Sequence, residues 1–322
     1  MRPKKALTRL LSYSLFEGRP ATTKVRWLNP IIMANLRRIS ENNKQYKTVE
    51  KPIFILGTGR SGTTILGVVL SIHQDIGYLN EPKAIWHLIH PQEDVIGSYT
   101  NSDSLYKLSS NDSSIEMKER AKQLFGAYLS TTGSHRVVDK YPELIFRVEF
   151  VRELFPDARF ILLIRNGWDT CHSIAKWSEQ FGVEIRGESH NWWGVNNRKW
   201  HLMVDQLVAT NDRLSRFVEE IRNFDRHLDK ASIEWIVTMQ QGIEIKKKYP
   251  ENILKVTFEE LTSNPIRMLT EISNFCELPY DKKLIEYGES TLHPIPTRDT
   301  FQLDPVVKPI FYDIMRELGY NS

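Results

Sequence analysis

Residues 53–64, with the sequence IFILGTGRSGTT, lead from an apolar run through a glycine-rich turn into a helical pattern. The run at residues 53–56 is short and unbroken, as in a strand that is buried on both faces of a parallel sheet, and Gly57 and Gly59 end it. Residues 63–71 then predict a helix. Because parallel strands are joined by crossover connections of this kind, the unit predicts an α/β fold.

The same alternation of strand and helix continues along the chain. Strand-like runs occur at residues 76–79, 136–139, 160–164 and 253–258, and helical patterns at residues 116–129, 143–155, from about 167, and 265–275. Strands that alternate with helices predict a central parallel sheet flanked by helices on both faces. Residues 196–249 have a largely helical pattern and predict a helical insertion.

The N-terminal segment differs from the rest of the chain in charge. Residues 1–50 hold eleven Lys and Arg against three Glu, a net charge of +8 in a chain whose total is +3. We therefore expect a basic N-terminal helical extension at residues 1–50 and a single domain at residues 51–322. The extension either packs on the domain as a solvated helix or contacts an anionic membrane surface. The acidic remainder argues against a nucleic-acid partner.

Composition narrows the class of protein. With 41% hydrophobic and 26% charged residues, the chain has the profile of a soluble globular protein. Its apolar runs are far shorter than the roughly 20 residues of a membrane-spanning helix. Cys171 and Cys276 are too few for a disulfide framework or a four-thiolate metal site, and no signal-peptide pattern is evident. We expect a cytoplasmic protein without a bound metal, and peripheral membrane contact stays open.

The glycine-rich turn has the composition of a phosphate or sulfate cradle. It lies where free backbone N–H groups and the helix dipole attract an anion, and Ser61, Thr63 and Thr64 add hydroxyl donors. A nucleotide-triphosphatase loop would carry Lys where this chain has Thr63. The cation is instead Arg60, upstream, which argues against a kinase and for a different phosphoryl-like donor.

Two blocks resemble one known family. The string PIFILGTGRSGTT resembles the 5′-phosphosulfate loop of sulfotransferases that use 3′-phosphoadenosine 5′-phosphosulfate (PAPS), especially tyrosylprotein and carbohydrate sulfotransferases. The segment DKYPELIFRVEFVRELFPDARFILLIRNGWDTCHSI, residues 139–174, resembles a second block of the same family. The resemblance runs with gaps from about Ile53 to Tyr320, and it implies a P-loop NTPase-like fold and PAPS as co-substrate.

The resemblance also implies which residues bind the donor. The residues implied for the 5′-phosphosulfate are Arg60, Ser61, Gly62, Thr63 and Thr64, and those for the 3′-phosphate are Arg165 and Ser173. Lys308, in a VVKP that resembles the family's VIKP, is a further nucleotide contact. The chain departs from the family at Phe258, which lacks a phenolic hydroxyl, and at Trp177, where tyrosylprotein enzymes carry an arginine.

Two charged residues are the catalytic candidates. Glu81 follows a strand-like run, and its separation from Arg60 resembles that of the catalytic glutamate of tyrosylprotein enzymes, so we expect it to take the acceptor proton. Lys140 ends another strand and is expected to stabilise the leaving group during in-line transfer. His87, His90 and His135 are alternative bases.

The acceptor is the least determined part of the reaction. Residues 182–200 are dense in aromatic and amide side chains, including Trp192, Trp193 and Trp200, a composition suited to a sugar or to core packing. We expect a hydroxyl of a carbohydrate or glycoconjugate, with a small-molecule alcohol or phenol as the alternative. A P-loop small-molecule kinase and a non-catalytic nucleotide-binding scaffold are the rival functions.

Overall fold

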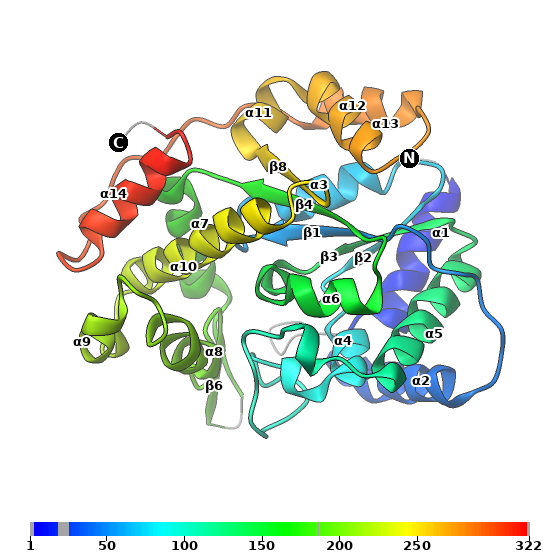
Figure 1. Ribbon diagram of the computed structural model, residues 1–322, viewed down its shortest axis with the longest axis horizontal. Coiled ribbons are helices and arrows are strands. Elements are labelled where there is room, and N and C mark those ends of the chain that lie inside the picture. The colour runs from blue at the N-terminus through cyan, green and yellow to red at the C-terminus, as the bar shows by residue number, and fades with distance from the viewer. Residues whose placement is uncertain (1–2, 19–25, 186, 321–322) are drawn as a thin grey trace.

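A five-stranded parallel sheet forms the centre of the computed structural model, which describes residues 3–18, 26–185 and 187–320 (Figure 1). The strands, in spatial order, are β2 (Ile76–Asn80), β3 (Arg136–Lys140), β1 (Ile53–Gly57), β4 (Arg159–Ile164) and β8 (Ile253–Thr257). Each strand coincides, to within one residue at either end, with the strand-like run that predicts it. The expected α/β fold with a central parallel sheet is confirmed.

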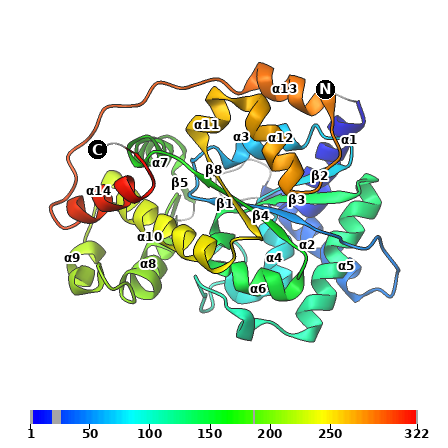
Figure 2. The same cartoon turned by 45° about the horizontal axis from the view of Figure 1, so that its top comes forward.

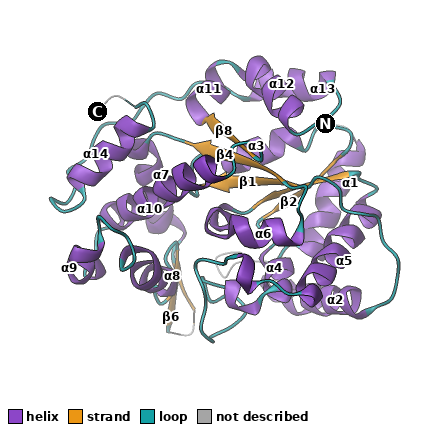
Figure 3. Ribbon diagram, in the orientation of Figure 1, coloured by secondary structure: helices purple, strands orange, loops and turns teal. Residues whose placement is uncertain are grey.

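Helices cover both faces of the sheet because successive residues of each buried strand point to opposite sides. Ile53 and Ile55 of β1 belong to one hydrophobic core, and Phe54 and Leu56 belong to the other. The first core is closed by α3 (Thr63–Leu70), α11 (Phe258–Ser263), α12 (Pro265–Phe275) and α13 (Lys282–Thr291). The second is closed chiefly by α2 (Asn29–Glu41), α4 (Lys83–Ile89), α5 (Ile115–Thr132), α6 (Val148–Leu154), α7 (Gly167–Phe181), α10 (His227–Lys248) and α14 (Lys308–Glu317). Figure 3 shows this sheet between its two helical layers.

Residues 196–249 are largely helical, as the pattern predicts, and contain α8 (Arg198–Met203), α9 (Val218–Arg222) and α10. A small antiparallel sheet, which the pattern does not predict, lies between α7 and this region. Its strands are β5 (Val183–Ile185), β6 (Glu188–Asn191) and β7 (Gly194–Val195). The predicted helix at residues 143–155 is likewise divided, because Pro142–Arg147 forms a 3₁₀-helix before α6 begins. Arg147 is fully buried there and its guanidinium donates 2.8 Å hydrogen bonds to Glu93.

The first and last described helices pack on the helical layers. α1 (Pro3–Leu11) continues into a π-helical turn, Ser12–Phe16, and packs against β2 and α5. After α13, a long extended segment leads to α14 (Figure 2). Residues 1–2 and 19–25 of the predicted extension lie outside the described residues. Among the helices that the structure describes, none is long and apolar enough to cross a bilayer.

Candidate active site

The loop between β1 and α3 forms one wall of the candidate site. Gly62, the N-cap of α3, has a φ angle of +96°. A Cβ atom at this position would lie 2.3 Å from the ring of Phe258, so the loop needs glycine here for both backbone angle and space. Thr63 and Thr64, the first residues of α3, line a cavity. Their end of the helix presents free N–H groups and a positive dipole, which favour an anion.

The cavity has a volume of about 380 Å³ and lies at the carboxyl ends of the sheet strands. Because parallel strands end at the same edge, residues far apart in the sequence meet there. The predicted site residues that line the cavity are Arg60, Gly62, Thr63, Thr64, Glu81, Lys140, Arg165 and Ser173. The structure thus brings together the predicted donor-binding and catalytic groups, with two exceptions.

Ser61 and Lys308 are the exceptions. Ser61 is buried, and its hydroxyl donates a hydrogen bond to Thr58 O at 2.6 Å. Ser61 therefore stabilises the loop and does not face the cavity. Lys308 begins α14 as an exposed residue and is not part of the cavity wall. Among the described residues, the three histidines considered as alternative bases, His87, His90 and His135, do not line the cavity either.

Glu81 and Lys140, which both line the cavity, form an ion pair. Lys140 Nζ donates to Glu81 Oε1, and Glu81 N donates to Lys140 O at 2.8 Å, which extends the pairing of β2 with β3 by one residue. Glu81 has a φ angle of +53°, in the left-handed region that is rare for a residue with a side chain. The Lys140 side chain is 3% exposed and that of Glu81 is 37% exposed, so the carboxylate is the more accessible partner.

Two ammonium groups control the ionisation of Glu81. Burial alone would raise the pKa of this carboxyl, but the charges of Lys140 and Lys83 outweigh it and hold the pKa well below its usual value. Lys83 Nζ lies 3.7 Å from Glu81 Oε2 and 3.9 Å from Glu143 Oε1. Glu81 is therefore a carboxylate at neutral pH, the form that can accept a proton.

Arg60 and Arg165 form a second, cationic part of the site. Arg60 Nε donates to Ser173 Oγ at 3.2 Å, and Arg165 Nη1 donates to Arg60 O at 3.3 Å. The Arg165 guanidinium lies over the Phe258 ring, 4.6 Å from its centroid. Burial lowers the pKa of both guanidinium groups, and the charge of Arg165 lowers that of Arg60 further. Within the described chain neither group forms an ion pair with a carboxylate.

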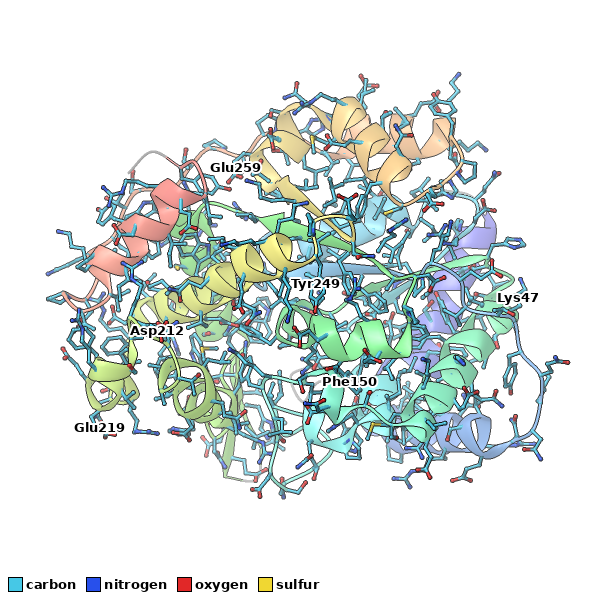
Figure 4. The ribbon with its side chains drawn as sticks, viewed as in Figure 1. Lys47, Phe150, Asp212, Glu219, Tyr249 and Glu259 are labelled. Carbon is cyan, nitrogen blue, oxygen red and sulfur yellow. The ribbon has the colours of Figure 1, made fainter. Side chains whose placement is uncertain are left out.

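These observations fit a phosphate-bearing ligand. Among the described residues, the buried Arg165 Nε has no hydrogen-bond partner, and the neighbouring Arg60 and Arg165 guanidinium groups form no ion pair with a carboxylate. A phosphate group would supply both the acceptor oxygens and the negative charge. Nearby, Glu259, which is labelled in Figure 4, accepts hydrogen bonds from Asn166 N at 3.0 Å and from the Tyr320 hydroxyl at 2.7 Å. Glu259 thereby holds the turn that follows Arg165.

The cavity wall also contains a buried polar cluster that the sequence did not predict. Lys199 Nζ donates to Glu234 Oε1, and Trp192 Nε1 donates to Glu234 Oε2, both at 2.5 Å. Trp192 lines the cavity, whereas Trp193 and Trp200 are buried in the core. Of the three tryptophans considered for sugar stacking, Trp192 is therefore the one placed to meet a ligand. In the described residues, no cluster of three His, Cys, Asp or Glu side chains could hold a metal ion.

Comparisons with known proteins agree with this architecture. Residues 52–282 match the model of the sulfotransferase family. Protein-tyrosine sulfotransferase A of Caenorhabditis elegans is 23% identical over 84% of this chain and 61% of its own length. An uncharacterized protein of Aquifex aeolicus is 24% identical over 79% of this chain and 29% of its own length. The chain spans less than two thirds of the length of both relatives.

A solved structure shares the fold. The crystal structure of sulfotransferase STF9 from Mycobacterium avium superposes with a TM-score of 0.51 at 14% identity, over 99% of this chain and 96% of that one. The family model covers well over half of the chain and includes both the phosphate loop and the Glu81–Lys140 pair. This chain therefore belongs to the sulfotransferase family, whose members take a sulfuryl group from PAPS.

Proposed function

We propose that this protein is an enzyme that transfers the sulfuryl group of PAPS to a hydroxyl group of an acceptor. The observation that carries the proposal is the single cavity in which Arg60 and Arg165, without carboxylate partners among the described residues, lie beside the Glu81–Lys140 pair. Such a transfer depends on positioning the donor and on balancing charge as it develops. The charged groups that line this cavity are suited to both tasks.

In the proposed reaction, each group has a separate task. PAPS supplies a sulfuryl group whose bond to the 5′-phosphate breaks. The β1–α3 loop with Arg60 holds the phosphosulfate, and Arg165 with Ser173 holds the 3′-phosphate. Glu81 accepts the proton of the acceptor hydroxyl as its oxygen bonds to sulfur, and Lys140 places positive charge on the leaving phosphate oxygen. The Lys140 ammonium has three donor hydrogens, so it can direct one of them to that oxygen when the donor binds.

The proposed acceptor is a carbohydrate or glycoconjugate. Trp177 and Trp192 line the cavity with their ring centroids 5.3 Å apart, beside Asn191 and His190. Aromatic faces with neighbouring amide and imidazole groups suit a sugar ring and its hydroxyls. A small phenol or alcohol is the alternative, since Tyr106 and Phe146 line the same cavity. A panel of oligosaccharides, phenols and tyrosine peptides with radiolabelled PAPS would separate these acceptors.

Calorimetric titration tests the donor site. We expect adenosine 3′,5′-bisphosphate to bind the wild-type protein more tightly than ATP with magnesium. In Arg165→Ala, bisphosphate affinity should fall about tenfold or more, because a hydrogen bond to a charged group contributes about 1.5–3 kcal/mol.

Arg38 provides the matched control for this titration. It is an exposed arginine of α2, outside the cavity, and Arg38→Ala should bind the bisphosphate as the wild type does. Preference for ATP with magnesium would contradict the proposal and favour a kinase. Tight bisphosphate binding without turnover of any acceptor in the panel would favour a scaffold.

A further inference from the structure

Residues 3–18 lie along the free edge of β2, although they precede the family-matched residues 52–282. β2 is an edge strand of the sheet, and alternate residues of a strand turn their backbone groups to the same side. Three side chains bind these outward groups. Lys5 Nζ donates to Ile76 O, Arg9 Nη1 donates to Tyr78 O at 3.3 Å, and Glu17 Oε1 accepts from Asn80 N at 2.6 Å.

Arg9 and Glu17 bind each other as well as the strand. Arg9 Nη1 pairs with Glu17 Oε1, and Arg9 Nη2 donates to Glu17 Oε2 at 2.8 Å. The Glu17 side chain is only 2% exposed. A buried carboxylate is retained when it is paired and hydrogen-bonded, and here its bonds go to Arg9 and to the backbone of Asn80. The pair therefore fixes the carboxyl end of β2.

That end of the strand carries the proposed base. Asn80 directly precedes Glu81, whose left-handed backbone persists only if its surroundings hold it. Two backbone contacts do so, one toward β3 from Glu81 N to Lys140 O and one within the following turn from Lys83 N to Glu81 O at 2.7 Å. The contact of Glu17 with Asn80 N holds the strand from its other side.

Arg9 and Glu17 also share a second cavity with the proposed catalytic residues. This cavity, of about 210 Å³, is lined by Arg9 and Glu17 together with Glu81 and Lys140. Glu81 and Lys140 also line the larger cavity, so the two cavities meet at the ion pair. The N-terminal segment thus builds one side of the site.

We propose that Glu17, paired with Arg9, is a positioning residue that holds Glu81 in the geometry needed to accept the acceptor proton. The proposal rests on the proposed function, in which Glu81 is the base. Glu17 acts through the backbone of Asn80 and does not line the larger cavity, where donor and acceptor are proposed to bind. Its loss should therefore slow turnover without weakening donor binding.

The test compares Glu17→Ala with the wild type in the hydrolysis of radiolabelled PAPS, with water as acceptor. We expect kcat to fall at least tenfold, while KM for PAPS and the Kd for adenosine 3′,5′-bisphosphate change less than twofold. The kcat of Glu17→Gln should lie between those of Glu17→Ala and the wild type, because the amide oxygen of the glutamine can still accept a hydrogen bond from Asn80 N. If Glu17→Ala does not fold, the same kcat and Kd measurements on Glu17→Gln decide the question.

Lys5→Met is the matched control, since it removes a contact of the same segment with the same strand, but at Ile76. Its kcat should stay within twofold of wild type. In a Glu81→Gln background, Glu17→Ala should cause little further loss, because it acts through Glu81. Three outcomes would overturn the positioning role of Glu17 without affecting the proposed function. They are a wild-type kcat in Glu17→Ala, an equal loss of kcat in Lys5→Met, and a full additional loss of kcat in the double variant. Undiminished kcat in Glu81→Gln would instead overturn the proposed base.

Discussion

Lys140 is the residue on which the ionisation of Glu81 most depends. In Lys140→Met, the burial that opposes ionisation of Glu81 is offset mainly by Lys83, so the pKa of Glu81 rises. Only the ionised carboxylate accepts a proton. The acid limb of kcat/KM should therefore move to higher pH in the variant, and the rate at neutral pH should fall about 10²–10³-fold through loss of charge stabilisation. The pH dependence of PAPS turnover measures both effects.

Lys122 is the control for this profile. It is an exposed lysine of α5 that pairs with Glu119 at 2.8 Å and does not line the cavity. Lys122→Met should keep the wild-type acid limb. An unshifted limb in Lys140→Met would show that the titrating base is a group other than Glu81.

Some individual residues of the site could be predicted from the sequence, and others could not. Glu81 and Lys140 were predictable because each follows or ends a strand-like run at a spacing that resembles the family. Lys83 was not, because one lysine after a proline looks like a surface residue. Only packing shows its ammonium buried beside Glu143 and 5.3 Å from the Tyr141 ring. The role of Phe258 was not predictable either. The sequence shows only that it lacks the phenolic hydroxyl found in the family, whereas in the structure its ring packs against the Arg165 guanidinium.

The β1–α3 loop is the element whose backbone matters most for donor binding. In Gly62→Ala, a Cβ would be forced into the left-handed region and against the Phe258 ring. We expect a loss of about 1–3 kcal/mol in the free energy of unfolding, because the strained loop must shift. Bisphosphate affinity should fall at least tenfold as the N–H groups move. Chemical denaturation and calorimetry measure the two quantities.

Gly319→Ala is the control that distinguishes the effect of backbone strain from an effect on the binding site. Gly319 has a similar φ angle of +90°, and apart from its chain neighbours no atom of the described residues lies within 4 Å of its added Cβ position. Gly319→Ala should lower stability but leave bisphosphate affinity within twofold. If Gly62→Ala bound the bisphosphate as tightly as Gly319→Ala does, the loop would not be the anion site.

Elements with a simple hydrophobic period were predictable, and those shaped by tertiary contacts were not. The buried sheet strands read as short apolar runs, so their positions follow from the sequence. α4 did not, because its seven residues mix Lys83 and His87 with apolar side chains and show no clear stripe. The strands β5 to β7 are too short and polar to give an alternating pattern.

At the scale of the whole molecule, the site depends on a strand order that periodicity cannot supply. β1 lies between β3 and β4, although β2 follows it in the chain, and this order places Lys140 and Arg165 on either side of the phosphate loop. Hydrophobic patterns identify strands but not their neighbours. The resemblance of the two motif blocks to one family, rather than the pattern, indicated that these distant residues share a site.

Because the site joins distant segments, a ligand bound there should stabilise the molecule as a unit. A ligand at 100 times its Kd that binds only the folded state adds about 2.7 kcal/mol to the free energy of unfolding. Adenosine 3′,5′-bisphosphate should therefore raise Tm by several degrees and slow hydrogen exchange both in residues 57–64 and around Arg165. At equal concentration, adenosine 5′-monophosphate, which lacks the 3′-phosphate, should protect the loop more than the Arg165 region. Equal protection of both regions by the two nucleotides would show that Arg165 does not bind the 3′-phosphate.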